Sequence, residues 1–495
     1  MTDWLIGLLS FASLGAFLLL AEWFRRTMKW SGEITRKLTH VSVGLLVCIV
    51  AEFMASPLPA LTLGVLFTVV DFLAIRFHWL KGIHDTGRAT YGTSFYPLAF
   101  TLLVLFFWQH HKPVLILSML VLSLADAGAA MAGRAQRKPR YYQLMSEPKT
   151  LLGSMIMGII TLLVIGVGLY YFQTGSTTPV KAGFLLVAAL ISAVLGVAVE
   201  ALSWRGSDNL SVPLATAVSV YVFLYAPADI QNQYVVGFLL ALGISVLSYR
   251  LRFLTASGST AAFVIGTMVF GLGGWPFALP LLMFFLTSSL LSKVGGSRKR
   301  SFEHLFEKGS IRDAGQVLAN GVIPAIVVVA AFFRQESIWY LMYVGTVAAI
   351  TADTWGTEIG VLAGGQPRNI INLRRTTTGT SGSISLLGTA AGLLGAFGIS
   401  AVGVVFLPGR KGGLLLALLT VAGLIGALMD SIMGATLQMQ YECGTCGKTT
   451  ERTVHCASLT TKVRGFSLIN NNTVNLLCAL SGGIAVWLLH LALES

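Results

Sequence analysis

Charged side chains are scarce in this sequence of 495 residues, where they make up 11% of the chain. In soluble proteins roughly a quarter of the residues are charged. This chain has instead 55% hydrophobic residues and a mean hydropathy of +0.76. These values exclude an ordinary soluble enzyme and predict an integral membrane protein.

Acidic residues are the scarcer charge, because 21 Asp and Glu stand against 34 Lys and Arg, for a formal net charge of +13. In a soluble protein this excess would suggest nucleic-acid binding, but the chain lacks a soluble domain that could perform it. We therefore expect no nucleic-acid partner. The distribution of the cations along the chain explains the excess better.

Apolar runs of about 20 residues are long enough to span the hydrocarbon of a bilayer. Sixteen such runs predict an all-α, polytopic membrane protein with about sixteen transmembrane helices. Their approximate limits are 4–24, 37–55, 57–77, 92–109, 113–133, 152–172, 181–203, 211–227, 233–250, 255–273, 275–293, 316–333, 337–360, 383–407, 413–438 and 468–491.

The positive charges give the orientation of these spans. If all sixteen runs cross, 29 of the 34 Lys and Arg lie on one face and 5 on the other. Since Lys and Arg in short loops stay cytoplasmic, both termini are predicted to lie outside, in a bacterial inner membrane or an equivalent membrane. The first run follows no cationic region, so 4–24 is expected to be a retained span.

Polar residues gather at the cytoplasmic ends of the spans, whereas a transporter needs them near mid-membrane. One helical stripe at the start of the second span consists of Glu33, Arg36, Lys37, His40 and Gly44. A stripe with both charge signs is costly in lipid, so we expect it to face protein or a bound ligand. A flank of snorkelling cations with a buried histidine is the alternative interpretation.

Two further polar positions follow in the first half. Asp126 and Arg134 lie near the cytoplasmic end of the fifth span, and Lys149 with Ser154 opens the sixth. Free backbone N–H groups and the helix dipole make such an opening a candidate phosphate cradle. A Walker P-loop and a dinucleotide-binding fingerprint are both absent, which argues against a soluble-type nucleotide fold.

Acidic residues complete this face of the first half. Glu200 ends the seventh span, and Asp208 with Asn209 begins the eighth, where either residue could simply cap the helix. Carboxylates can hold Mg²⁺, and the nearby cations can neutralise phosphate oxygens. The combination is typical of phosphoryl or nucleotidyl transfer.

The second half repeats this layout. Pro97 and Asp126 are 29 residues apart, and so are Pro324 and Asp353. The spans recur with a shift of 227 residues, and Asp430 occupies the place of the acid that ends the seventh span. Eight spans in each half would give both halves the same orientation, so we predict two parallel repeats.

The repeat divides the chain into membrane domains 1–229 and 230–495, the second of which carries an inserted loop, 441–464. This loop contains four soft metal ligands, which are Cys443, Cys446, His455 and Cys456. In a reducing cytoplasmic loop they fit a structural Zn²⁺ better than a disulfide. Adjacent His and Cys residues cannot easily both point at one metal, so zinc is a possibility at this stage.

The motifs of the first half resemble those of the phytol kinase and dolichol kinase family over about residues 30–225. Four ordered motifs carry the likeness: Glu33-Ile-Thr-Arg36-Lys37-Leu-Thr-His40, Ala125-Asp126, Lys149-Thr-Leu-Leu-Gly153-Ser154, and Glu200 with Asp208-Asn209-x-x-x-Pro213. Ala125 and Leu152 depart from the Gly and Glu that are usual in the family. The resemblance implies a CTP-dependent lipid kinase, and the signature of phosphatidate cytidylyltransferases is absent.

The second half, about 235–490, resembles the phytyl-phosphate kinase family, long known as a membrane domain of unknown function. Six ordered motifs carry this likeness: Ser257-Gly258, Gly315-Gln316-Val-Leu-Ala-Asn320-Gly321, Ala352-Asp353-Thr-Trp355-Gly-Thr-Glu358-Ile-Gly360, Thr378-Gly-Thr-Ser-Gly382, Asp430-Ser431 with Gly434-Ala-Thr-Leu-Gln438, and Asn471-Asn472-x-x-Asn475. Together the two likenesses imply a fused, bifunctional kinase. It would convert an isoprenoid alcohol such as phytol to the monophosphate and then to the diphosphate, with CTP as donor and Mg²⁺ as metal.

The resemblances and the residue chemistry imply these site residues. The catalytic group comprises Glu33, His40, Asp126, Glu200, Asp208, Asp353, Glu358 and Asp430, of which Asp126, Asp208, Asp353 and Asp430 would hold Mg²⁺. Nucleotide or phosphate binding is expected at Arg36, Lys37, Arg134, Lys149, Ser154, Asn209, Gln316, Asn320, Thr380, Ser381, Ser383, Asn471, Asn472 and Asn475. The lipid alcohol and its monophosphate would arrive from the bilayer and the nucleoside triphosphate from the cytoplasm.

Three other functions stay open at this stage. A single-step polyprenol or dolichol kinase would have a purely structural second half. A CTP-dependent nucleotidyl transferase would act on a lipid phosphate, and a lipid transporter would consume no nucleotide. The sequence leaves the lipid chain length and the oligomeric state undetermined.

Overall fold

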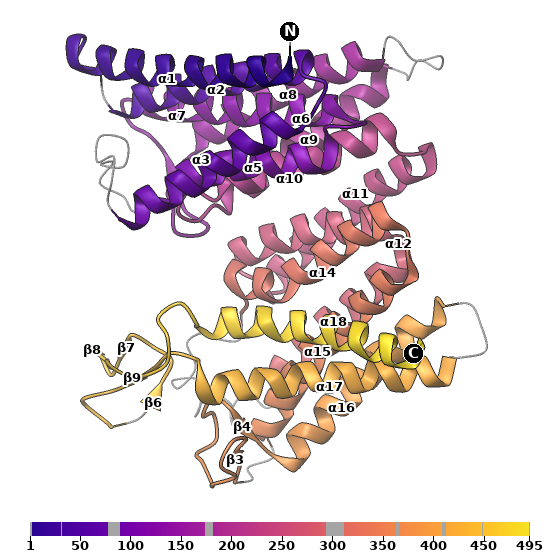
Figure 1. Cartoon of the computed structure of the whole chain (residues 1–495). Helices are drawn as coiled ribbons and strands as arrows, with labels where there is room; N and C mark the ends of the chain where they lie inside the picture. Colours follow the sequence, from indigo (N-terminus) through magenta and orange to yellow (C-terminus); the bar gives the residue numbers. More distant parts are fainter. Residues whose placement is uncertain are drawn as a thin grey trace. The chain divides into compact units, whose positions relative to one another are not determined.

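A computed structural model describes residues 2–30, 32–77, 90–173, 182–293, 311–362, 366–407, 412–447 and 449–494 (Figure 1). Long helices dominate this part of the chain, so the predicted all-α membrane fold is confirmed. The chain forms two compact units, unit 1 from Met1 to Gln231 and unit 2 from Asn232 to Ser495.

Unit 1 consists mainly of helices, with one pair of short strands. Its elements are α1 (Asp3–Thr27), α2 (Gly32–Phe53), α3 (Leu58–Arg76), α5 (Gly92–Phe107), α6 (Lys112–Leu120), the π-helical turn η1 (Val121–Ala125), α7 (Asp126–Ala135), β1 (Tyr141–Tyr142), β2 (Lys149–Thr150), α8 (Leu151–Gln173), α9 (Ala182–Ala201) and α10 (Asp208–Tyr225). Helix α11 (Ala228–Arg250) begins at the boundary and lies mostly in unit 2.

Unit 2 continues with longer helices and a small lobe of strands. Its elements are α12 (Ala256–Lys293), α14 (Ala314–Arg334), α15 (Ser337–Leu362), β3 (Arg368–Asn369), β4 (Ser383–Ile384), α16 (Leu386–Val405), α17 (Gly412–Thr436), β5 (Gln440–Glu442), β6 (Thr449–Thr450), β7 (Val454–His455), β8 (Ser458–Leu459), β9 (Thr461–Arg464) and α18 (Asn471–Glu494). Helix α15 packs against α16, α17 and α18, and its first sixteen residues are mostly buried.

Twelve helices in the described residues are long and apolar enough to cross a membrane. Helix α5 is apolar but shorter. The expected spans 255–273 and 275–293 correspond to the two helical segments of α12, which meet at Gly274. Helix α12 kinks at Gly274, where φ is +64° and ψ is −157°, a conformation that is essentially restricted to glycine. The expected count of sixteen crossings stays a prediction.

Both units place a two-stranded antiparallel pair directly before a helix. In unit 1, β1 pairs with β2 and α8 follows, and in unit 2, β3 pairs with β4 and α16 follows. In each unit an Asp lies on the helix before the pair, Asp126 on α7 and Asp353 on α15. An acid lies in the C-terminal part of the second helix after the pair, Glu200 on α9 and Asp430 on α17. The order of elements agrees with the predicted repeat, which stays a prediction.

Candidate functional site

The first site lies in unit 1, where α2 meets the start of α7. Lys37 Nζ donates a short hydrogen bond to Asp126 Oδ2, and His40 Nε2 lies 3.8 Å from the same oxygen. The turn η1 immediately precedes Asp126, and π-helical turns of this kind are frequent at functional sites. The structure thus brings three predicted site residues together.

Close packing fixes the helix α2 against this turn. A Cβ at Gly44 would lie 1.6 Å from the Ser123 Oγ, so only glycine permits this approach. Ser123 also shares a hydrogen bond of 3.1 Å with Tyr96, whose ring stands edge-on to the imidazole of His40. The small residue at position 44 therefore sets the distance between His40 and Asp126.

A second cation, Lys149 on β2, connects to three carboxylates. Its Nζ lies 2.7 Å from Glu200 Oε1, 3.1 Å from Asp208 Oδ2 and 3.7 Å from Glu147 Oε2. Burial by itself would lower the pKa of the Lys149 ammonium, but Asp208 and Glu200 outweigh that effect and raise it. Lys149 therefore stays charged. It also interacts electrostatically with Asp126. This interaction connects the carboxylates around Lys149 with the group formed by Lys37, His40 and Asp126.

Glu147 belongs to this site although the sequence analysis did not include it among the site residues. Its carboxylate accepts hydrogen bonds from Ser203 Oγ at 3.2 Å and from the Gly206 backbone N–H at 2.8 Å. Glu147 thereby ties the loop before β2 to the turn that leads into α10. The sequence feature that could have identified Glu147 is its position two residues before Lys149, in the sequence Glu-Pro-Lys.

The other predicted residues of unit 1 take varied positions. Ser154 shares a hydrogen bond of 2.6 Å with the Tyr142 hydroxyl, and Asn209 donates through Nδ2 to the Gly206 carbonyl at 3.2 Å. Arg134 is exposed and Arg36 is half-buried. The side chain of Glu33 lies outside the described residues.

The ion pairs of this site are not balanced in charge. Four carboxylates, on Asp126, Glu147, Glu200 and Asp208, pair with two ammonium groups, on Lys37 and Lys149. Within these pairs two negative charges remain in excess. In the described structure Glu200 Oε2 and His40 Nε2 are buried without a hydrogen-bond partner. Surplus carboxylate oxygens of this kind are the ligands that Mg²⁺ prefers, so the residues fit a divalent cation.

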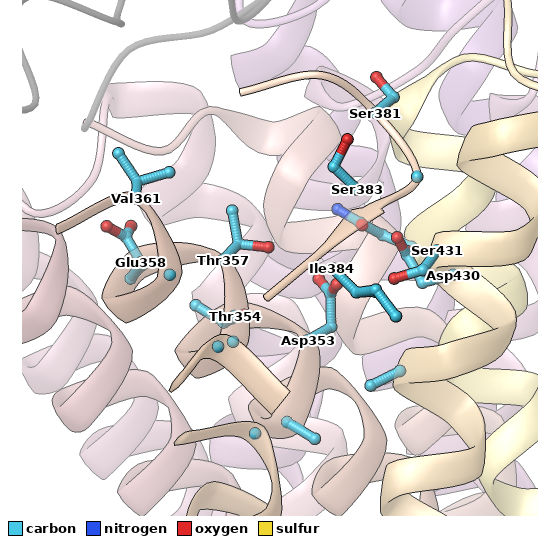
Figure 2. A pocket seen from close by; sticks show the side chains of 18 of the residues that line it. Asp353, Thr354, Thr357, Glu358, Val361, Ser381, Ser383, Ile384, Asp430 and Ser431 are labelled. Atoms are coloured by element: carbon cyan, nitrogen blue, oxygen red, sulfur yellow. The ribbon is translucent and has the colours of Figure 1, made fainter. Parts of the chain in front are cut away.

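The second site is a cavity of about 350 Å³ within unit 2 (Figure 2). Helices α15, α17 and α18, the start of α14 and the loop before α16 contribute its lining. Ten predicted residues line it: Gln316, Asn320, Asp353, Glu358, Thr380, Ser381, Ser383, Asp430, Asn471 and Asn475. Asn472 is not part of the lining, and its Oδ1 is buried without a hydrogen-bond partner in the described structure.

Asp353 on α15 and Asp430 on α17 lie next to each other in the cavity and interact directly through their side chains (Figure 2). Asp430 Oδ2 is buried and lacks a hydrogen-bond partner among the described residues. In that part of the chain neither carboxylate forms a salt bridge with a Lys or Arg. Two adjacent buried carboxylates repel each other unless a proton or a cation lies between them, so this pair also fits a divalent metal.

Most hydroxyl groups of the loop before α16 bond within the loop. Ser383 Oγ shares a 2.7 Å hydrogen bond with Thr376, and Thr380 Oγ1 donates to the Thr377 carbonyl at 2.8 Å. Gln316, predicted to bind phosphate, accepts from the Asp313 N–H through its Oε1 as part of a capping box on α14. These side chains line the cavity, but part of their hydrogen-bonding capacity is used in shaping it.

Two charged residues of the cavity were missed by the sequence analysis. Arg312 precedes α14, and Glu451 comes from the strand lobe between β6 and β7. Burial lowers the pKa of the Arg312 guanidinium, while the nearby Glu358 opposes this effect. The described lining thus holds one cation and four carboxylates, on Asp353, Glu358, Asp430 and Glu451.

The chain was compared with known proteins. A family model described as "Integral membrane protein DUF92" matches residues 239–483. "Protein PGR" of Arabidopsis thaliana is 34% identical over 259 residues, which cover 47% of this chain and 87% of that protein. An uncharacterized membrane protein of Methanocaldococcus jannaschii is 29% identical, with 52% of this chain and 94% of that protein covered.

A protein named "Phytol kinase" from Synechocystis is 31% identical over 223 residues, which cover 45% of this chain and 93% of that protein. No solved structure matches the chain. The relatives that are more than 30% identical are covered over most of their own length. The chain therefore belongs to a phytol kinase-like family of integral membrane proteins, with the DUF92 family represented in its C-terminal half.

Proposed function

We propose that the chain is a bifunctional membrane kinase that phosphorylates an isoprenoid alcohol such as phytol in unit 1 and its monophosphate in unit 2. The observation that carries the proposal is the presence of two acid clusters, one within each unit, with different accompanying groups. Unit 1 adds two lysines and a histidine to its carboxylates, whereas the described cavity lining of unit 2 adds one arginine and several amides.

The first reaction transfers a phosphoryl group to a neutral hydroxyl. The alcohol oxygen forms a bond to the terminal phosphorus of the nucleotide, the bond to the bridging oxygen breaks, and the nucleoside diphosphate leaves. The hydroxyl proton must go to a base. His40 is suited to accept it, because its Nε2 has no described hydrogen-bond donor and lies beside Asp126. Lys37 and Lys149 are suited to neutralise phosphate oxygens.

The second reaction has a different requirement. Its nucleophile is an oxygen of the lipid monophosphate, which is already ionised at neutral pH, so no base is needed. The described lining of the unit 2 cavity agrees with this need, since it contains no histidine or lysine. Arg312 can pair with phosphate oxygens, and the amides of Asn320, Asn471 and Asn475 can donate hydrogen bonds to them.

Mg²⁺ and CTP are part of the proposal. Asp126 and Asp208 in unit 1 and Asp353 and Asp430 in unit 2 would hold Mg²⁺. A bound Mg²⁺ would neutralise the negative charge of the nucleotide phosphates. CTP is the proposed donor because the unit 1 motifs resemble those of CTP-dependent lipid kinases.

The membrane arrangement makes two successive steps in one chain reasonable. A long isoprenoid stays in the bilayer with its head group at the interface, while nucleotide arrives from water. We propose that both sites open to the cytoplasmic face and that both termini lie outside. The uneven distribution of Lys and Arg between the two faces supports this orientation. The monophosphate could then move from one unit to the other without leaving the membrane.

The test is product analysis with purified full-length protein in lipid nanodiscs. The protein is incubated with phytol, MgCl₂ and CTP labelled in the terminal phosphate, with ATP in a parallel reaction. We expect labelled phytyl monophosphate first and the diphosphate later, with CTP preferred. If the reaction stops at the monophosphate, and supplied monophosphate is not converted either, the second activity is rejected. If no labelled lipid forms at all, both activities are rejected.

A further inference from the structure

Four soft ligands of the strand lobe, which comprises residues 440–464, converge on one point. The ligand atoms of Cys443, Cys446, His455 and Cys456 all lie within 4.8 Å of one another. His455 Nδ1 lies 3.5 Å from Cys446 Sγ and 3.3 Å from Cys456 Sγ. With Zn–S bonds of about 2.3 Å and Zn–N bonds of about 2.0–2.1 Å, the sulfur and nitrogen of a tetrahedral site lie about 3.5 Å apart. The spacing matches such a site.

The backbone of two tight turns produces this convergence. In the first, the Gly447 N–H donates to the Cys443 carbonyl at 2.8 Å, and Gly447 has a φ of +66°. The second turn joins β7 to β8 through Cys456 and Ala457, whose φ values are +51° and +58°. This conformation lets adjacent His455 and Cys456 face the same side, which resolves the difficulty seen in the sequence.

Neither residue of the second turn is the type that its conformation favours. Turns with positive φ at both central positions usually contain Asn, Asp or Gly, because other side chains are strained there. Cys456 and Ala457 are none of these three types, so another interaction must compensate for the backbone strain of the turn. The lobe is also far shorter than the roughly 40 residues below which disulfides or metals are usually needed for a stable fold. All five cysteines of the chain are free thiols.

We propose that Cys443, Cys446, His455 and Cys456 bind one structural Zn²⁺, and that this metal holds the strand lobe against the cavity of unit 2. Three thiolates and one imidazole in a closed tetrahedral arrangement are typical of structural rather than catalytic zinc sites. The thiolates replace the hydrogen bonds and apolar contacts that so small a lobe cannot supply. Zinc binding is thus coupled to the folding of residues 440–464.

The lobe contacts the cavity through Glu451 and the end of α17 through Arg464. Glu451 Oε1 accepts hydrogen bonds from Ser381 Oγ at 2.6 Å and from Gln438 Nε2 at 2.8 Å. Arg464 donates to the Gln440 side chain at 3.0 Å and to the Ala435 carbonyl, at the end of α17, at 2.8 Å. Loss of the metal would therefore release Glu451 from the cavity wall and free the end of α17, the helix that carries Asp430.

The first experiment measures metal content. Full-length protein is purified in detergent without chelators, and zinc and iron are measured by inductively coupled plasma mass spectrometry. We expect one zinc per chain in the wild type and loss of most of it in Cys446→Ser and Cys456→Ser, both of which alter exposed thiols. The matched control is Cys48→Ala in unit 1, which should keep its zinc.

Cobalt substitution covers the case in which a cysteine variant fails to fold. Wild-type protein stripped with a chelator and supplied with Co²⁺ should show the visible absorption of a tetrahedral thiolate site, which Zn²⁺ then displaces. Absence of zinc after supply of Zn²⁺, iron in its place, or a disulfide between two of these cysteines in a peptide map would each overturn the proposal.

The second experiment tests whether the metal keeps the lobe folded, and it does so without measuring activity. Trypsin can cut the lobe after Arg452 and Lys462. We expect the zinc-loaded protein to resist cleavage there, and the chelated protein to be cut at least several-fold faster, with restored resistance after Zn²⁺ is added back. Equal cleavage rates with and without the metal would contradict a role of zinc in holding the lobe. Neither result depends on the proposed kinase activities.

Discussion

Ser381, in the loop before α16, donates a hydrogen bond of 2.6 Å to Glu451 in the strand lobe, 70 residues further along the chain. Gln438 donates to the same carboxylate oxygen, so one acid joins the lobe, the end of α17 and the cavity loop. Glu451 is thus placed to act on the second site both through its charge and through the position of Ser381.

Two substitutions at Glu451 separate these effects. In Glu451→Gln the amide oxygen can still accept both hydrogen bonds, so we expect a small loss in the conversion of phytyl monophosphate. In Glu451→Ala the anchor is removed, and we expect a loss of about 10–100-fold, the range found when a supporting contact of a site is lost. Initial rates with supplied monophosphate measure both, and exposed Glu442→Gln is the control. Wild-type rates in Glu451→Ala would contradict this role.

Asp126→Asn should stop the first reaction and spare the second. The substitution removes the negative charge that Lys37 and His40 face and one proposed Mg²⁺ ligand. We expect phytol phosphorylation to fall by about 10²-fold or more, the range seen when one group that stabilises a transition state is removed. Conversion of supplied monophosphate should stay at the wild-type rate. Asp71→Asn, in α3 of the same unit, is the control, and equal loss of both reactions would reject separate sites.

Asp353→Asn should produce the reverse pattern. Asp353 and Asp430 face each other in unit 2, and the amide cannot hold a divalent cation as a carboxylate does. With phytol and CTP as substrates, we expect monophosphate to accumulate while the diphosphate is lost. Thin-layer separation of labelled products over time measures both species. Accumulation of unreacted phytol would show that unit 2 residues serve the first reaction and would contradict the assignment.

The residues that sequence could locate are those whose partners lie on predictable helix faces. The stripe of α2 placed Lys37 and His40 on one side, and the acid near the end of the fifth span gave Asp126 as a partner. Glu451 and Arg312 could not be located this way, because the cavity that they line is assembled from loops and helices far apart in the chain. Loop conformation depends on tertiary contacts that no periodicity records.

The helix boundaries show the same limit. Apolar length predicted two spans in 255–293, and the structure has two helical segments there that meet without a loop at Gly274, whose φ and ψ are not helical. The sequence shows glycines at 273 and 274 and prolines at 276 and 280, which are compatible with either a loop or a kink. Likewise, the π-helical turn before Asp126 leaves no composition signal, since its residues Val-Leu-Ser-Leu-Ala would suit an ordinary helix.

Lys149→Met tests the cation that joins three carboxylates of unit 1. Removal of the ammonium leaves Glu200 and Asp208 buried without their partner, and breaking a buried ion pair in this way typically costs about 3–5 kcal/mol. We expect a lower thermal unfolding temperature and loss of the first reaction. The double variant Lys149→Met/Glu200→Gln should recover part of the stability but not the activity. If the double variant is no more stable than the single one, the two residues are not coupled.

Gly382→Ala tests the close approach of the cavity loop to α17. Gly382 has a φ of +77°, and a Cβ there would lie 2.4 Å from the Ala435 backbone nitrogen. Alanine is strained at this φ by about 1–3 kcal/mol, and the clash with backbone atoms forces the loop away from the end of α17. Since the same loop carries Ser381 and Ser383, we expect the second reaction to fall while the first continues, so that labelled monophosphate accumulates. The control Gly413→Ala, near the start of α17, meets no atom within 4 Å and should behave as wild type. An unchanged diphosphate yield in Gly382→Ala would mean that the loop can move without affecting the cavity.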